Sequence, residues 1–251
     1  MKSKRKASVK SKLEASMKSK PEASVKMSKP EASVKSKPEE RRVALACAPH
    51  SGWAALVGLE LDGGRPRVSA HLRMEMADPD DGEAKQPYHA VEGLAIGEAR
   101  RRLARYEAEA RGMAHAALER IVRELARGGL RVVGLGILES AGRKGDSLDA
   151  ILASHALIHT ADGDHFRDAI AAAADRCGVP VSRVRSRDLD AEAASAIGRP
   201  SPVLRETVQS LGREAGPPWT VDQKAAALLA WLVLRRGSAG AARGKRPNRR
   251  S

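Results

Sequence analysis

Residues 43–76 read VALACAPHSGWAALVGLELDGGRPRVSAHLRMEM and contain the pattern of three consecutive strands. The short apolar run Val43–Ala48 is typical of a buried strand, and Trp53–Leu61 has the composition of a second one. Asp62-Gly63-Gly64 is a hairpin turn signal. Val68–Met76 alternates apolar and polar residues as a third strand does. The stretch therefore predicts that the folded domain opens with three strands joined by hairpins.

Helical and strand patterns alternate after the acidic loop at 78–82. The predicted elements are a helix over Gly97–Arg127, a strand over Leu130–Leu138, helices over Ser147–Ala161 and Asp164–Cys177, a strand over Val179–Val184, helices over Asp190–Ile197 and Pro202–Arg213, and a last helix from Thr220 to about Arg235. Gly163 is expected to separate the two middle helices, with Asp164 as N-cap of the second. This order predicts an α/β fold of the ribonuclease H-like type, a mixed five-stranded sheet with helices on both faces.

The positive charge of the chain is concentrated at its two ends. Residues 1–42 hold 14 Lys or Arg against 5 Glu, and residues 235–251 hold 7 basic residues and no acid. The net charge of the whole chain is +14, so residues 43–234 carry a net charge of −2. Basic arms are typical of proteins that bind a polyanion, most often nucleic acid. The tail residues predicted to contact it are Lys2, Lys4, Arg5, Lys6, Arg243, Lys245, Arg246, Arg249 and Arg250.

The N-terminal tail also contains an internal repeat. The heptapeptide KPEASVK occurs at 20–26 and again at 29–35. Its prolines prevent a continuous helix, and its few apolar side chains cannot offset the entropy lost on ordering. We therefore predict one folded domain over 43–234 between two disordered basic tails, 1–42 and 235–251.

The cysteines and the apolar runs indicate where the protein resides. Cys47 and Cys177 lie in apolar surroundings without metal-ligand spacing, which favours a reduced cytoplasmic setting over a disulfide framework. No apolar run reaches the ~18 residues of a membrane span, and the start of the chain lacks the apolar stretch of a secretion signal. We expect a cytoplasmic protein without a membrane partner, and the basic tails also fit association with the nucleoid.

Four stretches of the domain are similar to the RuvC-type Holliday-junction resolvases, a branch of the ribonuclease H-like superfamily. They are Ala46-Cys47-Ala48-Pro49-His50-Ser51-Gly52-Trp53-Ala54, Leu135-Gly136-Ile137-Leu138-Glu139, Gly178-Val179-Pro180-Val181, and Gly216–Lys224 with the Ala/Leu-rich helix after it. The resemblance implies a divergent member of this family, with nucleic acid as substrate and two Mg²⁺ or Mn²⁺ ions as nuclease cofactors. RuvC-type enzymes act as dimers, so it also implies a homodimer as one arrangement, and the helix over 97–127 is our candidate for its interface.

The end of the first strand departs from the family pattern. Ala48 stands where the family has an aspartate, and it offers no oxygen to Mg²⁺ or Mn²⁺, which need hard oxygen ligands. Glu139 and Asp222 remain as the two candidate catalytic and metal-binding residues, where the family uses three or four acids. Each also has an ordinary explanation, Glu139 as an exposed residue that opens a loop and Asp222 as an acid favoured by the helix dipole. Ala48 and His50 are expected to line this altered site.

A second group of polar residues begins in the helix predicted over 147–161. His155 and His159 are four residues apart, so they share a helix face and could ligate a transition metal or line the site. Asp162, Asp164 and His165 are further candidate ligands. No spacing fixes a third ligand, however, and histidines that pack in a core or face a groove are the commoner case.

Three functions fit these observations. The first is a nucleic-acid-binding protein, for DNA rather than RNA, with a degenerate or rebuilt RuvC-like nuclease site. The second is an active Mg- or Mn-dependent endonuclease that uses Glu139 and Asp222, with His155 or His159 near an altered centre. The third is a scaffold for protein partners, with tails that only keep the chain in solution. We favour the first.

Overall fold

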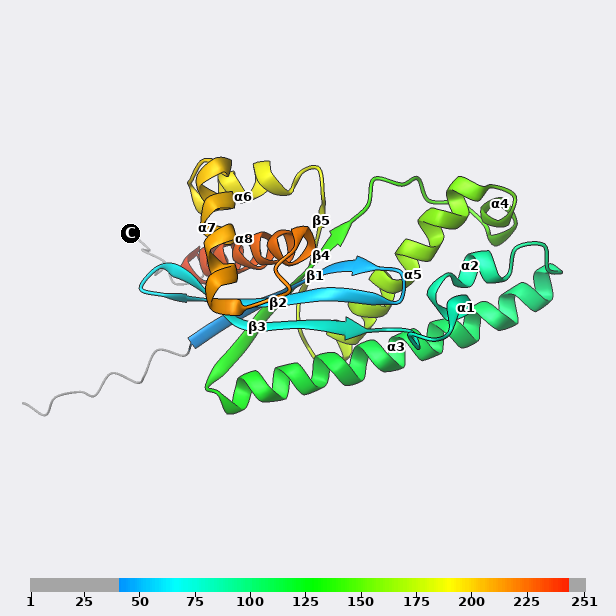
Figure 1. Ribbon diagram of the computed structural model, residues 1–251, viewed down its shortest axis with the longest axis horizontal. Coiled ribbons are helices and arrows are strands. Elements are labelled where there is room, and N and C mark those ends of the chain that lie inside the picture. Colours follow the sequence, from blue (N-terminus) through cyan, green and yellow to red (C-terminus); the bar gives the residue numbers. More distant parts are fainter. Residues whose placement is uncertain (1–40, 244–251) are drawn as a thin grey trace, which may run out of the picture. The chain divides into compact units, whose positions relative to one another are not determined.

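The computed structural model describes residues 41–243, with side chains through Gly237 (Figure 1). Residues 1–40 and 244–251 lie outside the described part. The side chains predicted to contact nucleic acid from the tails are therefore outside it as well: Lys2, Lys4, Arg5, Lys6, Arg243, Lys245, Arg246, Arg249 and Arg250.

A five-stranded mixed sheet forms the centre of the fold, in the order β3-β2-β1-β4-β5. Its strands are β1 (Arg41–His50), β2 (Trp53–Asp62), β3 (Arg65–Glu75), β4 (Leu130–Glu139) and β5 (Val181–Arg185). The first three pair antiparallel through hairpins, whereas β4 runs parallel to β1 and β5 parallel to β4. Because β4 and β5 are reached by helical crossovers, this is the ribonuclease H-like arrangement, and the predicted fold class is confirmed.

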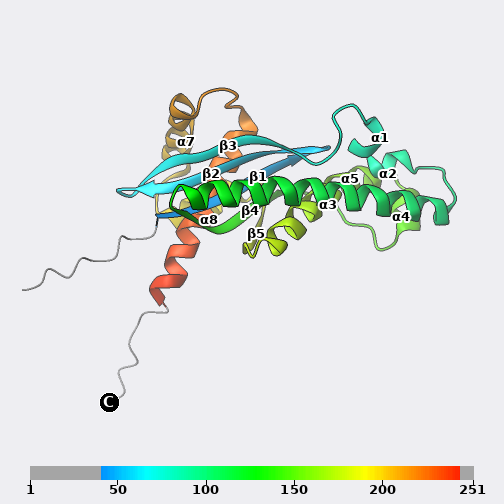
Figure 2. The ribbon, with the colours of Figure 1, turned by 90° about the horizontal axis from the view of Figure 1, so that it is seen from below.

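Helices cover both faces of the sheet (Figures 1 and 2). One face packs on α3 (Ile96–Arg127) and α5 (His155–Arg176), and the other packs on α8 (Val221–Arg243), with α6 (Leu189–Ile197) and α7 (Ser201–Ala215) beside it. Strand β1 supplies both layers, because successive side chains point to opposite faces. Leu45 and Cys47 join the cluster under α3 and α5, while Ala46 and Ala48 join the cluster under α8.

Two short helices were not predicted: α1 (Gly82–Lys85) and α2 (Pro87–Ala90). A third, α4 (Leu148–Leu152), is the first part of the helix predicted over Ser147–Ala161. The Asp81 side chain caps α1 by accepting the Ala84 N–H (3.0 Å), so the acidic loop around 78–82 turns into a helix N-terminus. Ser147 caps α4 in the same way, accepting the Ala150 N–H (3.2 Å).

The predicted helix break at Gly163 is wrong. α5 runs through this residue without interruption, and the break lies between α4 and α5, at Ala153–Ser154. The glycine packs against a long side chain: a Cβ at Gly163 would lie 2.5 Å from a guanidinium nitrogen of Arg167. Asp164 is consequently not an N-cap, but lies inside α5, where it pairs with Lys144 (3.4 Å) and Arg167 (3.5 Å).

Two further boundaries differ from the prediction. Strand β1 begins at Arg41, and α8 continues to Arg243 instead of ending near Arg235, so both ends of the folded part reach into the predicted tails. Within residues 41–243, no helix has the length and apolar composition needed to cross a membrane.

Burial of Cys47 predicts a stability change at alkaline pH. This thiol is fully buried under α3 and α5, and burial raises its pKa from 9.0 to about 12. A raised pKa means that Cys47 contributes its full stability below about pH 9 and loses it as the pH rises towards 12. We expect the stability advantage of wild type over Cys47→Ala to shrink by about 2 kcal/mol between about pH 8 and about pH 10.5, measured by urea unfolding. Cys177→Ala, at a half-buried thiol, is the control and should show a smaller change. A pH-independent difference for Cys47→Ala would contradict the burial.

Candidate functional site

The carboxyl ends of β1 and β4 meet at one edge of the sheet, which is where open α/β sheets place their sites. These strands are parallel, with Cys47 opposite Ile137. Ala48 and Glu139 therefore lie close to the same edge, as the sequence predicts, and the first turn of α8 lies beside it.

Ala48 is part of the apolar layer under α8. It is 5% exposed, and the same cluster contains Leu138 of β4 and Leu229 of α8. The position where the resemblance implies a metal-binding aspartate is thus filled by a methyl group within a hydrophobic cluster.

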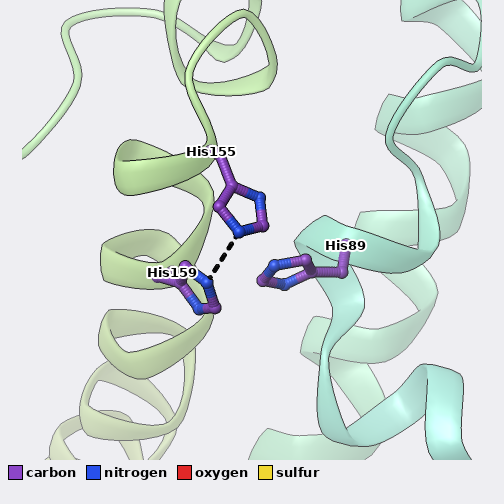
Figure 3. Close-up of side chains that lie close together, drawn as sticks. All are labelled: His89, His155 and His159. Carbon is purple, nitrogen blue, oxygen red and sulfur yellow. Dashed lines mark hydrogen bonds between the residues drawn. The ribbon is translucent and has the colours of Figure 1, made fainter.

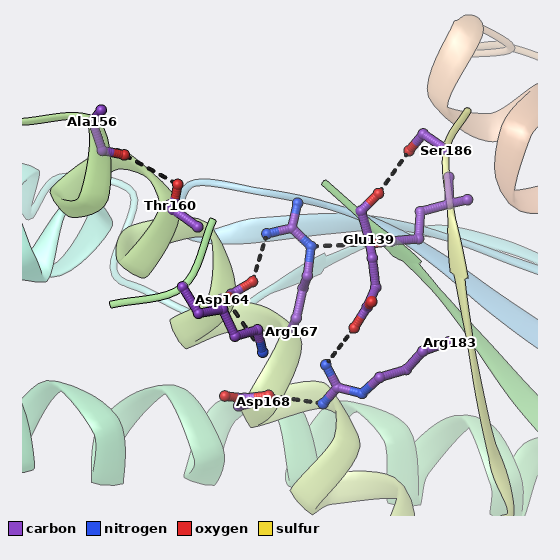
Figure 4. Close-up of polar contacts among 10 residues, drawn as sticks. Glu139, Ala156, Thr160, Asp164, Arg167, Asp168, Arg183 and Ser186 are labelled. Atoms are coloured by element: carbon purple, nitrogen blue, oxygen red, sulfur yellow. Dashed lines mark hydrogen bonds and ion pairs between the residues drawn. The ribbon is translucent and has the colours of Figure 1, made fainter. Parts of the chain in front are cut away.

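Glu139 points to the opposite face, because it follows Leu138 in the strand alternation. Its carboxylate accepts a hydrogen bond from Arg183 of β5 (3.0 Å), and Arg183 also donates to Asp168 of α5 (2.7 Å; Figure 4). Partial burial lowers the pKa of Arg183, but the hydrogen bonds to Asp168 and Glu139 and their charges outweigh it and raise that pKa. Nearby, the Arg167 Nε donates to the Leu138 carbonyl (3.0 Å). Glu139 is therefore neutralised by an arginine on the α5 face of the sheet.

Asp222 belongs to the α8 face. The start of α8 is a capping box: the Thr220 Oγ1 accepts the Asp222 N–H (3.3 Å), and the Gln223 Oε1 accepts the Thr220 N–H (2.9 Å). This cap holds Asp222 beside His50, whose Nε2 lies 3.1 Å from the aspartate Oδ1. The His50 ring in turn stacks on Trp53, with centroids 4.3 Å apart.

The structure thus gives Glu139 and Asp222 separate partners on opposite faces of the sheet. Within residues 41–243, the one group of three or more His, Cys, Asp or Glu side chains with converging ligand atoms lies elsewhere and contains no carboxylate. The residues at this edge do not fit a pair of Mg²⁺ or Mn²⁺ ions, which need several converging oxygens.

The converging group consists of three histidines. His155 and His159 lie in the first turns of α5, as predicted, and His89 of α2 joins them, with one ligand atom of each within 4.8 Å of the others (Figure 3). Sequence reasoning missed His89, because it lies in another helix and no spacing motif connects it to the pair. No element was predicted between residues 83 and 96, and nothing in that stretch marks His89 as a ligand.

Asp162, a predicted metal ligand, instead supports His89. It is 4% exposed and accepts hydrogen bonds from the Tyr88 N–H (2.7 Å) and from His89 Nδ1. Burial raises the pKa of Asp162, although the hydrogen bonds from Tyr88 and His89 oppose that shift. His165 lies away from this group, packed edge-on against Phe166, and burial lowers its pKa.

Three cationic side chains near the same sheet edge have no ion-pair partner among the described residues. Arg143 lies in the exposed loop after β4, Arg185 ends β5 opposite Glu139, and Lys224 lies in the first turns of α8. Positive charge at this edge is therefore available for an anionic ligand.

No family model matches the sequence, and no curated protein matches it. Among solved structures, the chain overlaps Thermus thermophilus RuvC with a TM-score of 0.47 and 15% identity, over 79% of this chain and 96% of that one. It overlaps T. thermophilus RuvC in complex with a Holliday-junction substrate with a TM-score of 0.45, at the same identity and coverage. An exopolyphosphatase from Cytophaga hutchinsonii gives a TM-score of 0.32 and 10% identity, over 61% of this chain and 36% of that one. The strand order and the helical crossovers described above place the chain among the ribonuclease H-like folds.

Proposed function

We propose that this protein binds nucleic acid, DNA rather than RNA, through a ribonuclease H-like domain that lacks a carboxylate-metal nuclease centre. The observation that carries the proposal is the edge formed by β1 and β4. Ala48 packs in a hydrophobic cluster there, and Glu139 forms an ion pair with Arg183. An ion bound at this edge would lack the first-strand oxygen and would compete with Arg183 for the Glu139 carboxylate.

The charge distribution supports nucleic acid as the ligand. Residues 1–42 and 235–251 hold 21 Lys or Arg against 5 Glu, whereas residues 43–234 carry a net charge of −2. Phosphate contacts from such segments give affinity without reading sequence. Arg143, Arg185 and Lys224 would add contacts at the sheet edge, where they would orient the nucleic acid on the domain.

The remaining assignments follow from the same proposal. A cytoplasmic location, including the nucleoid, fits a DNA ligand and two free cysteines. A homodimer, for which α3 is the candidate interface, is the arrangement that the RuvC resemblance implies.

Binding of labelled DNA by the full chain tests the proposal. Fluorescence anisotropy with a four-way junction, a linear duplex and a single strand should show salt-dependent binding that needs the tail charges. Absence of binding to all three at low salt would refute it.

A further inference from the structure

Three imidazoles from two helices converge at the side of α5 that faces α2. His155 and His159 project from successive turns of α5, and His89 projects towards them from α2 (Figure 3). The ring centroid of His89 lies 5.3 Å from that of His155 and 4.5 Å from that of His159. The group contains three of the 7 histidines of the chain.

The separation of the two α5 nitrogens suits a metal ion, and the His89 ligand atom lies within 4.8 Å of both. His155 Nε2 and His159 Nε2 are 3.1 Å apart. A tetrahedral zinc ion with Zn–N bonds of about 2.0–2.1 Å holds its nitrogens roughly 3.3 Å apart. Without an ion, one Nε2 donates a hydrogen bond to the other.

His89 is oriented as a ligand by a buried carboxylate. Its Nδ1 donates to Asp162, which leaves Nε2 with a free lone pair. Asp162 is itself held by the Tyr88 N–H (2.7 Å) and is almost fully buried. A carboxylate that fixes the tautomer of a histidine and raises its basicity is the usual outer partner of a zinc-bound imidazole.

We propose that His89, His155 and His159 bind a divalent transition-metal ion of the zinc type, with Asp162 as the outer partner of His89. Imidazole nitrogens favour Zn²⁺, Ni²⁺ or Cu²⁺ over Mg²⁺ and Mn²⁺, so this is a different ion from the one expected of a RuvC-like nuclease. His155 and His159 are exposed, so the ion is open to solvent and has a fourth position for water. The ion would tie α2 to α5. The site stands independently of nucleic-acid binding.

The test uses the full chain, freed of metal by a chelator that is then removed. Titration with Zn²⁺ against a chromophoric competitor gives the stoichiometry and Kd, and Co²⁺ in place of Zn²⁺ reports geometry through its visible absorption. We expect one ion per chain and the intense visible bands of four-coordinate Co²⁺. Asp162→Asn should weaken Zn²⁺ binding roughly 10- to 100-fold, and His89→Ala and His159→Ala by more than that.

One control variant and a comparison of two site variants make the outcome unambiguous. His115→Ala removes a histidine of α3 outside the group and should leave the Kd unchanged. His89→Ala removes one of the two hydrogen-bond donors to the buried Asp162 and so risks misfolding, whereas His159 is exposed and its replacement tests the site in a folded chain. Unchanged Kd in His159→Ala would overturn the proposal. Full affinity in a folded His89→Ala chain would show that the α5 pair suffices and would overturn it too, as would a six-coordinate Co²⁺ spectrum.

Discussion

Replacement of every lysine and arginine in residues 1–40 and 244–251 by glutamine will lower the affinity for duplex DNA at least about 100-fold at low salt. These two segments together hold 16 Lys or Arg and 5 Glu, and all five glutamates lie in residues 1–40. Each phosphate that a cation neutralises releases counterions, so log K falls with log salt at a slope of about −0.9 per contact. If only six of the tail cations engage phosphates, the slope should flatten by about 5 in the substituted protein.

A second variant distinguishes the effect of the tail charge from the effect of the tail sequence. It scrambles the order of residues 1–40 while keeping their composition, and it should bind as wild type does because phosphate contacts carry no sequence information. Fluorescence anisotropy over a range of salt concentrations measures both quantities. If the glutamine variant binds DNA with unchanged affinity and an unchanged slope of log K against log salt, the DNA interface lies on the domain and not on the tails. Arg143, Arg185 and Lys224 would then be the next residues to replace.

Gly136→Ala should destabilise the domain by about 3 kcal/mol, a large share of the roughly 5–15 kcal/mol that holds a domain of this size folded. Gly136 lies in β4 where α8 crosses the sheet. A Cβ there would lie 2.5 Å from Cγ of Leu229 and 2.8 Å from its Cδ2, which is closer than packed carbons approach. Leu229 of α8 is fully buried, so moving it away would disturb the close packing of its neighbours. The midpoint of urea unfolding measures the change.

Two further variants test whether the stability lost in Gly136→Ala comes from the contact between β4 and α8. Gly112→Ala lies in the middle of α3, where an added Cβ meets nothing within 4 Å, and it should stabilise the chain by up to about 1 kcal/mol. In the double variant Gly136→Ala/Leu229→Ala, the loss should be at least about 1 kcal/mol smaller than the sum of the single losses. Strict additivity would show that α8 does not pack against Gly136 as described.

The apolar runs and the turn signals were sufficient to predict the sheet. Alternation within Val43–Ala48 fills both layers of the core, and Asp62-Gly63-Gly64 forms the predicted hairpin between β2 and β3. Gly163 misled the prediction, because a glycine that makes room for the Arg167 guanidinium has the same appearance in sequence as one that ends a helix. Such packing depends on a side chain one turn away, whose direction the sequence does not specify.

The candidate site was predicted only in part, for a similar reason. Glu139 lies at the end of its strand as predicted, but its pairing with Arg183 depends on which face it points to and on the placement of β5. The histidine pair of α5 followed from helical spacing, whereas His89 reaches it only through the fold. Tertiary contacts of this kind have no local signature, so they appear only when the elements are assembled.

The most direct test of the account is cleavage of a labelled four-way junction and a single strand by the full chain, with Mg²⁺ or Mn²⁺, beside Glu139→Gln. Binding is scored on the same samples, so that a failure to cut is not confused with a failure to bind. The account predicts that both proteins bind and that neither cuts, because Ala48 supplies no oxygen and Glu139 is held by Arg183. Metal-dependent cutting by wild type that is lost in Glu139→Gln would contradict it, and would show a working nuclease centre built around Glu139.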